Sequence, residues 1–423
     1  MTQFPQPRSG PRPLPLLLAL EGWILQSSFA GLLTSSGAWP SLNQTPQDHP
    51  PENDPVRLLA AEAAGQSPSE LKGPWQTHLD PVRFLDALTR QSHDRMNSFV
   101  AGVRAYQAHP HRRAIEPLPA VWKRGAAMLR SAGGDGPAVL YVPSLVNRAY
   151  ILDLAADRSL VRASAQAGLG AYLLDWGDPT DAELAFTVTD YMEGVLIPAM
   201  EELAARTGGP IRLAGYCMGG TLTAAAAVLR PDLVSRMALL AAPWDFHTDS
   251  EAARALMRAM QLPLSMMIDA EGKASVDLLQ GLFASLDPTM AGRKFRGFAS
   301  LDPASEEARR FIDLEDWLNQ GVPLAAPVMK EVLSSWYGAN DPARGSWRVS
   351  DTIIDPAGIA CPTLALIPSQ DRIVPPESAR ALAVKIPGAV TRDVPFGHIG
   401  MVAGGSAPKR IYGPLIEWLR STS

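Results

Sequence analysis

The sequence predicts an α/β protein in which a mostly parallel sheet is covered by helices on both faces. Short, continuous apolar runs are the first sign, because strands that are buried on both faces have this pattern. The segments between successive runs are long enough for helices, which parallel strands need as crossover connections. The alternation stops at residue 246 and resumes after residue 350, so a helical insertion is expected inside the sheet domain.

The N-terminal residues precede this alternation. Arg8 and Arg12 stand before an apolar run at 14–20, as in a signal peptide, but Glu21 interrupts the run and no cleavage pattern follows. Export is therefore not expected. We expect a helix that packs on the body of the protein, with an amphipathic segment on an apolar surface as the alternative.

The N-terminal extension as a whole is expected at 1–110. Residues 34–75 are rich in Ser, Pro, Asn, Asp and Gln, which predicts a loose, partly disordered linker. The spacing of apolar residues after this linker predicts a helix over 81–106.

The α/β core is expected at 111–245 and 351–423, on either side of an insertion at 246–350. An insertion at the carboxyl ends of the strands covers the edge where α/β sheets bind ligands, so we expect it to form a cap or lid. The predicted strands are 121–129, 138–142, 171–176, 211–214, 237–241, 363–367 and 390–394. The predicted helices are 152–167, 189–207, 219–229, 377–384 and 408–420.

Composition narrows the class of function. The 423 residues are 46% hydrophobic and carry a formal net charge of -5, which gives no reason to expect a nucleic acid as partner. Cys217 and Cys361 are the two cysteines, so a disulfide scaffold is excluded. A working thiol suits a reducing compartment, and a cytoplasmic location is expected.

The sequence Gly215-Tyr216-Cys217-Met218-Gly219 has the G-x-S-x-G pattern of a nucleophile elbow, with a thiol in place of the hydroxyl. A predicted strand precedes it and a predicted helix follows it, which is the context that this motif requires in the α/β-hydrolase fold. The thiol stands at a helix N-terminus, where the helix dipole favours a thiolate. The motif therefore predicts a cysteine nucleophile for acyl transfer.

Two further residues complete a predicted catalytic triad. In this fold the acid and then the histidine follow the nucleophile along the chain. Asp371 and His398 have this order, and each follows a predicted strand. His398 would take the proton from Cys217, and Asp371 would orient the imidazole and stabilise its cation.

Other residues have weaker signals. An oxyanion hole needs two backbone N–H donors, which we expect from Met218 and from Val146 in the loop after strand 138–142. Arg148 is a candidate for contact with a substrate phosphate, with a surface ion pair as the alternative. His247 is expected to be structural or to position the cap, with contact to substrate as the alternative. No histidine has metal-ligand spacing, so no metal is expected.

Several segments together resemble the polyhydroxyalkanoate synthase family, particularly its shorter, two-component type. The resembling segments are 145–148, 157–162, 173–177, 215–221, 245–248, 371–376 and 397–400. By this resemblance the family's Cys, Asp and His fall on Cys217, Asp371 and His398. The resemblance implies a 3-hydroxyacyl-coenzyme A substrate, a polyester product made with release of coenzyme A, and no cofactor. It also implies that the protein acts at the surface of intracellular granules, either with a second synthase subunit or as a homodimer.

A thiol nucleophile fits polymerisation, because transfer from coenzyme A to Cys217 exchanges one thioester for another and keeps the acyl group activated. Two alternatives remain open. A wetter pocket would make the protein a thioesterase or esterase of the same fold, and the apolar N-terminal segment would also suit a non-catalytic granule-associated protein. The resemblance further leaves open that Asp371 helps to activate the substrate hydroxyl.

Overall fold

The computed structural model describes residues 8–35, 81–248 and 251–421. These residues form two compact units. The first contains the described residues up to Pro110 together with Asp287–Phe311, and the second contains those of His111–Leu286 and of 312–421. The linker expected over 34–75 lies outside the described residues beyond Ser35. The division into extension, core and cap stays a prediction.

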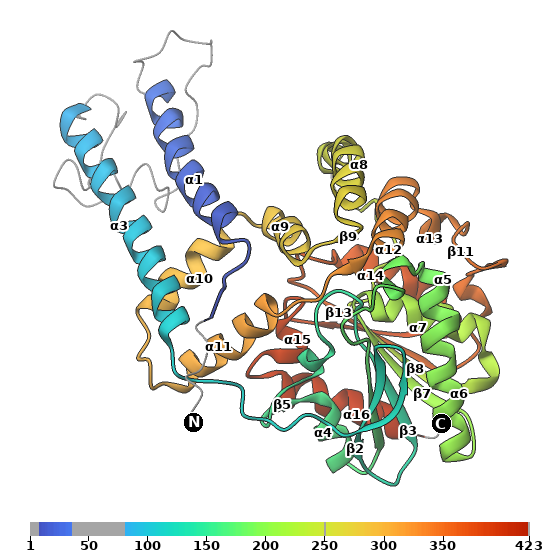
Figure 1. The fold of residues 1–423 in the computed structure, drawn as a ribbon. Helices are drawn as coiled ribbons and strands as arrows, with labels where there is room; N and C mark the ends of the chain where they lie inside the picture. The colour runs from blue at the N-terminus through green and yellow to red at the C-terminus, as the bar shows by residue number, and fades with distance from the viewer. Residues whose placement is uncertain (1–7, 36–80, 249–250, 422–423) are drawn as a thin grey trace. The chain divides into compact units, whose positions relative to one another are not determined.

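The second unit is built on an eight-stranded sheet (Figure 1). Its first two strands run antiparallel to their neighbours, and the other neighbouring pairs are parallel. The mostly parallel sheet is thus confirmed. In spatial order the strands are β1 (Ala120–Arg124), β2 (Ala127–Gly133), β6 (Gly170–Asp175), β3 (Ala138–Val142), β7 (Ile211–Tyr216), β8 (Val234–Leu240), β13 (Thr363–Pro368) and β14 (Val390–Val394).

Helices cover both faces of this sheet, as predicted (Figure 1). Side chains alternate along each strand, so Leu140 and Val142 of β3 join the core under one helical layer, and Val139 and Tyr141 join the core under the other. The first layer contains α5 (Val188–Tyr191), α6 (Ile197–Thr207), α7 (Met218–Leu229) and α14 (Pro376–Lys385). The second contains α4 (Leu160–Gln166), α15 (Gly400–Ala403) and α16 (Gly413–Arg420).

Two predicted elements are wrong in detail. The strand expected over 121–129 is the hairpin of β1 and β2, which turns at Gly125. That residue has a φ of 57°, and an added Cβ would lie 2.2 Å from Glu183 Oε1. A glycine is therefore needed at this turn, and it breaks the run into two strands.

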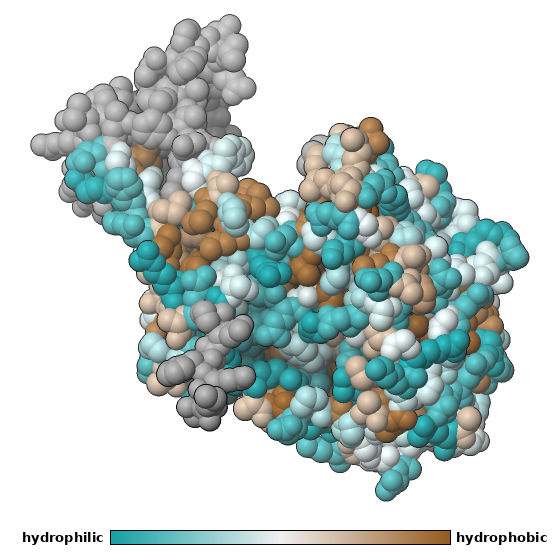
Figure 2. Space-filling view, viewed as in Figure 1, coloured by the Kyte–Doolittle hydropathy of each residue, from teal (hydrophilic) through white to brown (hydrophobic). Residues whose placement is uncertain are grey.

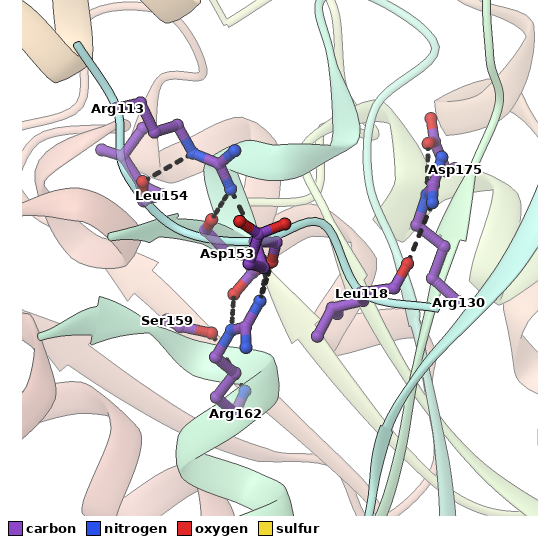
Figure 3. A network of polar contacts seen from close by, with 9 residues as sticks. Arg113, Leu118, Arg130, Asp153, Leu154, Ser159, Arg162 and Asp175 are labelled. Carbon is purple, nitrogen blue, oxygen red and sulfur yellow. Dashed lines mark hydrogen bonds and ion pairs between the residues drawn. The ribbon is translucent and has the colours of Figure 1, made fainter. Parts of the chain in front are cut away.

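The helix expected over 152–167 begins only at Leu160. A 3₁₀ turn ends at Leu152, and the rest of the expected first half instead forms the short strands β4 (Asp153–Ala155) and β5 (Arg158–Ser159). Buried Asp153 accepts hydrogen bonds from Arg162 at 2.7 and 3.1 Å, and its backbone carbonyl accepts one from Arg113 (Figure 3). The contacts of Asp153 with Arg162 and with distant Arg113 outweigh the helical pattern, and the Ser159 hydroxyl then caps α4.

The first unit is helical. It contains α1 (Leu14–Ser35), α3 (Pro81–Ala108) and α10 (Met290–Ala299), so the helices expected near the N-terminus and over 81–106 are confirmed. Glu21, which interrupts the apolar run, is buried and pairs with Arg296 at 2.7 Å. Among the described residues, no helix is both long enough and apolar enough to cross a membrane.

The insertion at 246–350 is largely helical, as predicted. Its helices besides α10 are α8 (Glu251–Glu271), α9 (Val276–Leu286), α11 (Glu306–Asn319), α12 (Ala326–Glu331), a π-helical stretch (Val332–Ala339) and α13 (Asp341–Arg344). Leu264 and Ile268 bury one face of α8. Elsewhere on this helix large apolar side chains are exposed, and they gather over it in Figure 2: Met260, Leu262, Met266 and Met267.

Candidate active site

The predicted elbow stands between β7 and α7. Cys217 follows the last residue of the strand and precedes the first residue of the helix, with φ 56° and ψ -132°. This region of backbone space is sparsely populated for a residue with a side chain, and the α/β-hydrolase elbow uses it to expose its nucleophile. The Cys217 N–H donates to Leu240 O of β8 at 2.9 Å, which fixes the turn to the sheet.

Three glycines make the turn sterically possible. A Cβ at Gly215 would lie 2.5 Å from the Gly220 Cα, and one at Gly219 would lie 2.2 Å from Val142 O and 2.4 Å from Pro143 O. Gly220 has the same restriction, because its Cβ would lie 2.4 Å from the Ala242 Cβ. The strand, the helix and the end of β3 thus meet at distances that exclude side chains.

Asp371 and His398 meet as predicted from their positions after β13 and β14. The His398 Nδ1 lies 2.6 Å from the Asp371 Oδ2. The other oxygen, Oδ1, accepts the N–H groups of Ile373 and Val374 at 2.8 and 2.9 Å. The Asp371 side chain has no exposed surface, so these three bonds fix the carboxylate and with it the imidazole.

The Cys217 side chain is near enough to the same imidazole for its charge to act on the pKa of His398. Since Nδ1 faces Asp371, the nitrogen that faces the thiol is Nε2. Burial lowers the pKa of His398, but the charge of Cys217, the hydrogen bonds to Asp371 and Cys217, and the charge of Asp371 outweigh it. They raise the pKa from its usual 6.5 to about 10. The site therefore favours the protonated imidazole of His398 at neutral pH, beside the sulfur of the predicted nucleophile.

The two expected oxyanion donors differ in their surroundings. Met218 is the first residue of α7, directly after Cys217. The Val146 N–H donates to the Ser144 Oγ at 3.0 Å. Val146 can therefore serve a substrate oxygen only if that bond opens, and the oxyanion hole stays a prediction. The signal that could have indicated this contact is the Ser144 hydroxyl two residues upstream, because such a hydroxyl is a common local partner.

Arg148 and His247 have protein partners. The guanidinium of Arg148 forms a two-pronged ion pair with Asp178, at 2.8 and 3.1 Å, and donates to Gln320 O. The His247 Nε2 lies 2.9 Å from Tyr337 O, in the π-helical part of the insertion. Contact of either residue with substrate stays a prediction. Within the described ranges, no cluster of three or more His, Cys, Asp or Glu side chains could hold a metal ion.

Comparison with known proteins gives a consistent family. A family model described as alpha/beta hydrolase fold matches residues 203–404. The chain is 29% identical to the poly(3-hydroxyalkanoate) polymerase subunit PhaC of Allochromatium vinosum, over 66% of this chain and 80% of that one. It is 28% identical to the protein of the same name from Thiocystis violacea, over 67% of this chain and 81% of that one. It is 30% identical to the protein of the same name from Synechocystis sp., over 66% of this chain and 77% of that one.

Proposed function

The chain belongs to the poly(3-hydroxyalkanoate) polymerase family, and from this premise we propose that it polymerises 3-hydroxyacyl-coenzyme A through a covalent thioester on Cys217. The observation that carries the proposal is the hydrogen bond from His398 to buried Asp371, with the elbow residue Cys217 near enough to act on the imidazole. A thiolate, an imidazolium and a fixed carboxylate are the groups that acyl transfer through a cysteine needs.

In the first step, the thiolate of Cys217 attacks the thioester carbonyl of 3-hydroxyacyl-coenzyme A. The N–H groups of Met218 and Val146 stabilise the oxyanion that forms, once the Ser144 contact has opened. The bond to the coenzyme A sulfur then breaks, and that sulfur takes the proton of the His398 imidazolium. The products are acyl-Cys217, neutral imidazole and free coenzyme A.

In the second step, the hydroxyl of an incoming 3-hydroxyacyl-coenzyme A attacks acyl-Cys217. His398 accepts the hydroxyl proton, a new ester bond forms, and Cys217 leaves as a thiolate. The thiolate and imidazolium are thereby regenerated. The thiolate then attacks the lengthened thioester, which releases coenzyme A and returns the chain to the enzyme. The role of Asp371 is to hold the imidazolium in both steps.

Water must be kept from acyl-Cys217, because hydrolysis competes with the acceptor hydroxyl. The aromatic cluster between the loop after β8 and the insertion supports a dry, capped site. Trp244, Phe246 and Trp336 are buried there, with the rings of Phe246 and Trp336 at 5.5 Å. We propose that 246–350 acts as the cap.

The setting of the reaction is part of the proposal. The exposed apolar side chains of α8 suit contact with a growing polyester chain or a granule surface in the cytoplasm. The relatives are named as subunits of a polymerase, which supports a second synthase subunit or a second copy of this chain as partner.

The test is an assay of products. The purified protein, with and without a second subunit from a relative, is mixed with 3-hydroxybutyryl-coenzyme A, and coenzyme A, polyester and free acid are measured. We expect coenzyme A release with polyester formation, loss of both in Cys217→Ala, and retention of both in the matched control Cys361→Ala. Coenzyme A release with free acid alone would make the protein a thioesterase and would reject the proposal.

A further inference from the structure

Tyr216 contacts the main chain and the ring of His398, and it is not a member of the proposed triad. It is the last residue of β7 and directly precedes Cys217. Its hydroxyl donates to the backbone oxygen of His398 at 3.3 Å. Its ring also lies against the imidazole, with centroids 5.2 Å apart and an angle of 34° between the planes.

Three separate interactions therefore act on His398. Asp371 bonds to its side chain, the charge of Cys217 acts on its imidazole, and Tyr216 bonds to its main chain. The loop that carries His398 follows β14 at the edge of the sheet, whereas β7 is a central strand. Because Tyr216 and Cys217 are neighbours at the end of that strand, the bond from Tyr216 ties the histidine loop to the strand that carries the nucleophile.

The chemistry of Tyr216 suits this task. The residue is only 4% exposed, and its ring packs in the core layer that contains Leu240 and Phe396. Burial, and then the negative charges of Cys217 and Asp371, hold the pKa of Tyr216 well above its usual value. The phenol therefore keeps its proton and remains a donor at neutral pH.

We propose that Tyr216 is a positioning residue, which holds the main chain of His398 so that the imidazole faces Cys217 and Asp371 together. Without its hydroxyl, the imidazole keeps both side-chain partners but loses its fixed distance to the thiolate. The proposal rests on the proposed function, since it concerns the same nucleophile and base.

The test is Tyr216→Phe, which removes one oxygen and keeps the ring. Both this variant and its control carry Cys361→Ala, so that iodoacetamide reacts only with Cys217. The control is Tyr141→Phe, which removes another buried hydroxyl, one that bonds to Ser164 of α4. The alkylation rate is followed against pH, and the imidazole of His398 is titrated by NMR with labelled histidine.

We expect Tyr216→Phe to shift the alkylation profile to higher pH. Loss of one neutral hydrogen bond changes the equilibrium constant for forming the thiolate–imidazolium pair by about fivefold. At the pH where the parent is alkylated at half its maximal rate, the Tyr216→Phe variant should therefore be alkylated about threefold more slowly. The His398 titration midpoint should fall. Tyr141→Phe should change neither. A Tyr216→Phe variant with the parental alkylation profile and His398 midpoint would overturn the proposal.

A second measurement covers the case in which Tyr216→Phe does not fold. In the unsubstituted protein, the ring carbon that bears the Tyr216 hydroxyl should shift with the same midpoint as His398, because the hydroxyl bonds to the main chain of His398 and the ring lies against its imidazole. A resonance that stays constant through that titration would also overturn the proposal. Neither measurement needs polymerisation, so a protein that makes only free acid rejects the proposed function and leaves the test of Tyr216 intact.

Discussion

The carboxylate of Asp371 accepts a hydrogen bond from His398 at 2.6 Å and has no contact with solvent. Two backbone N–H groups hold its other oxygen, so the carboxylate cannot rotate away from the imidazole without losing all three bonds. Such a carboxylate orients a histidine and stabilises its cation. This relationship gives the first prediction.

Asp371→Asn should lower the rate of Cys217 acylation by about three to four orders of magnitude, because the neutral amide no longer stabilises the imidazolium. The rate is measured as single-turnover release of coenzyme A. The matched control is Asp175→Asn, which removes a carboxylate at the end of β6 that pairs with Arg130. Normal acylation in Asp371→Asn, with slow elongation only, would mean that Asp371 serves the acceptor hydroxyl and not the histidine.

The charge of Cys217 should govern the titration of His398. The pKa of this imidazole is raised to about 10 because the neighbouring charges outweigh burial. Cys217→Ala removes one of those charges and leaves the burial, so the NMR titration midpoint should fall well below 10. Cys361→Ala should leave it in place. An unchanged midpoint in Cys217→Ala would show that the two side chains do not form an ion pair.

Gly219→Ala should prevent the elbow from adopting the backbone conformation seen in this structure. The new methyl group would lie 2.2 Å from Val142 O and 2.4 Å from Pro143 O, and both are backbone atoms. The free energy of unfolding should fall by about 3 kcal/mol or more in urea titrations. Gly194→Ala is the control, because nothing lies within 4 Å of its added methyl group and the backbone there is helical. It should be neutral or slightly stabilising. Equal stabilities for the two variants would contradict this account of the turn.

Asn340→Ala should loosen the insertion. Asn340 has a φ of 58°, accepts the N–H of Phe246 at 3.0 Å and donates to Asp245 Oδ1 at 2.8 Å. Loss of two buried hydrogen bonds should lower the free energy of unfolding by about 2–3 kcal/mol. If 246–350 keeps water out, the ratio of free acid to polyester should also rise.

Ser350→Ala is the control for this variant, because Ser350 also has a left-handed backbone, with φ 49°, but its hydroxyl bonds to exposed Glu193. Its stability and product ratio should be close to those of the parent. A destabilised Asn340→Ala variant with an unchanged product ratio would argue against a water-excluding role for this part of the insertion.

Local patterns explain what could be predicted from the sequence. Gly215, Cys217 and Gly219 lie within five residues of one another, and the turn that they form follows from their own backbone requirements. The meeting of Asp371 and His398 follows from topology, since the carboxyl ends of parallel strands share one edge of the sheet.

Contacts between distant residues explain what could not be predicted. A predicted helix begins eight residues late because Arg113 and Arg162 bind Asp153, and nothing near Asp153 in the sequence indicates the first of these partners. The helix α10 joins the first unit although it comes from the middle of the insertion. Its Phe295 packs directly against Gly102 of α3, a pairing across almost two hundred residues that periodicity does not reveal.

The most direct test of the central claim is the mass of the protein during turnover. Wild type and Cys217→Ala are mixed with 3-hydroxybutyryl-coenzyme A, quenched in acid within the first turnovers, digested and analysed by mass spectrometry. We expect 3-hydroxybutyryl units, singly and as short oligomers, on the peptide that contains Cys217, and no adduct in Cys217→Ala. Polyester formation without such an adduct, or an adduct that persists in Cys217→Ala, would contradict the claim that Cys217 carries the chain.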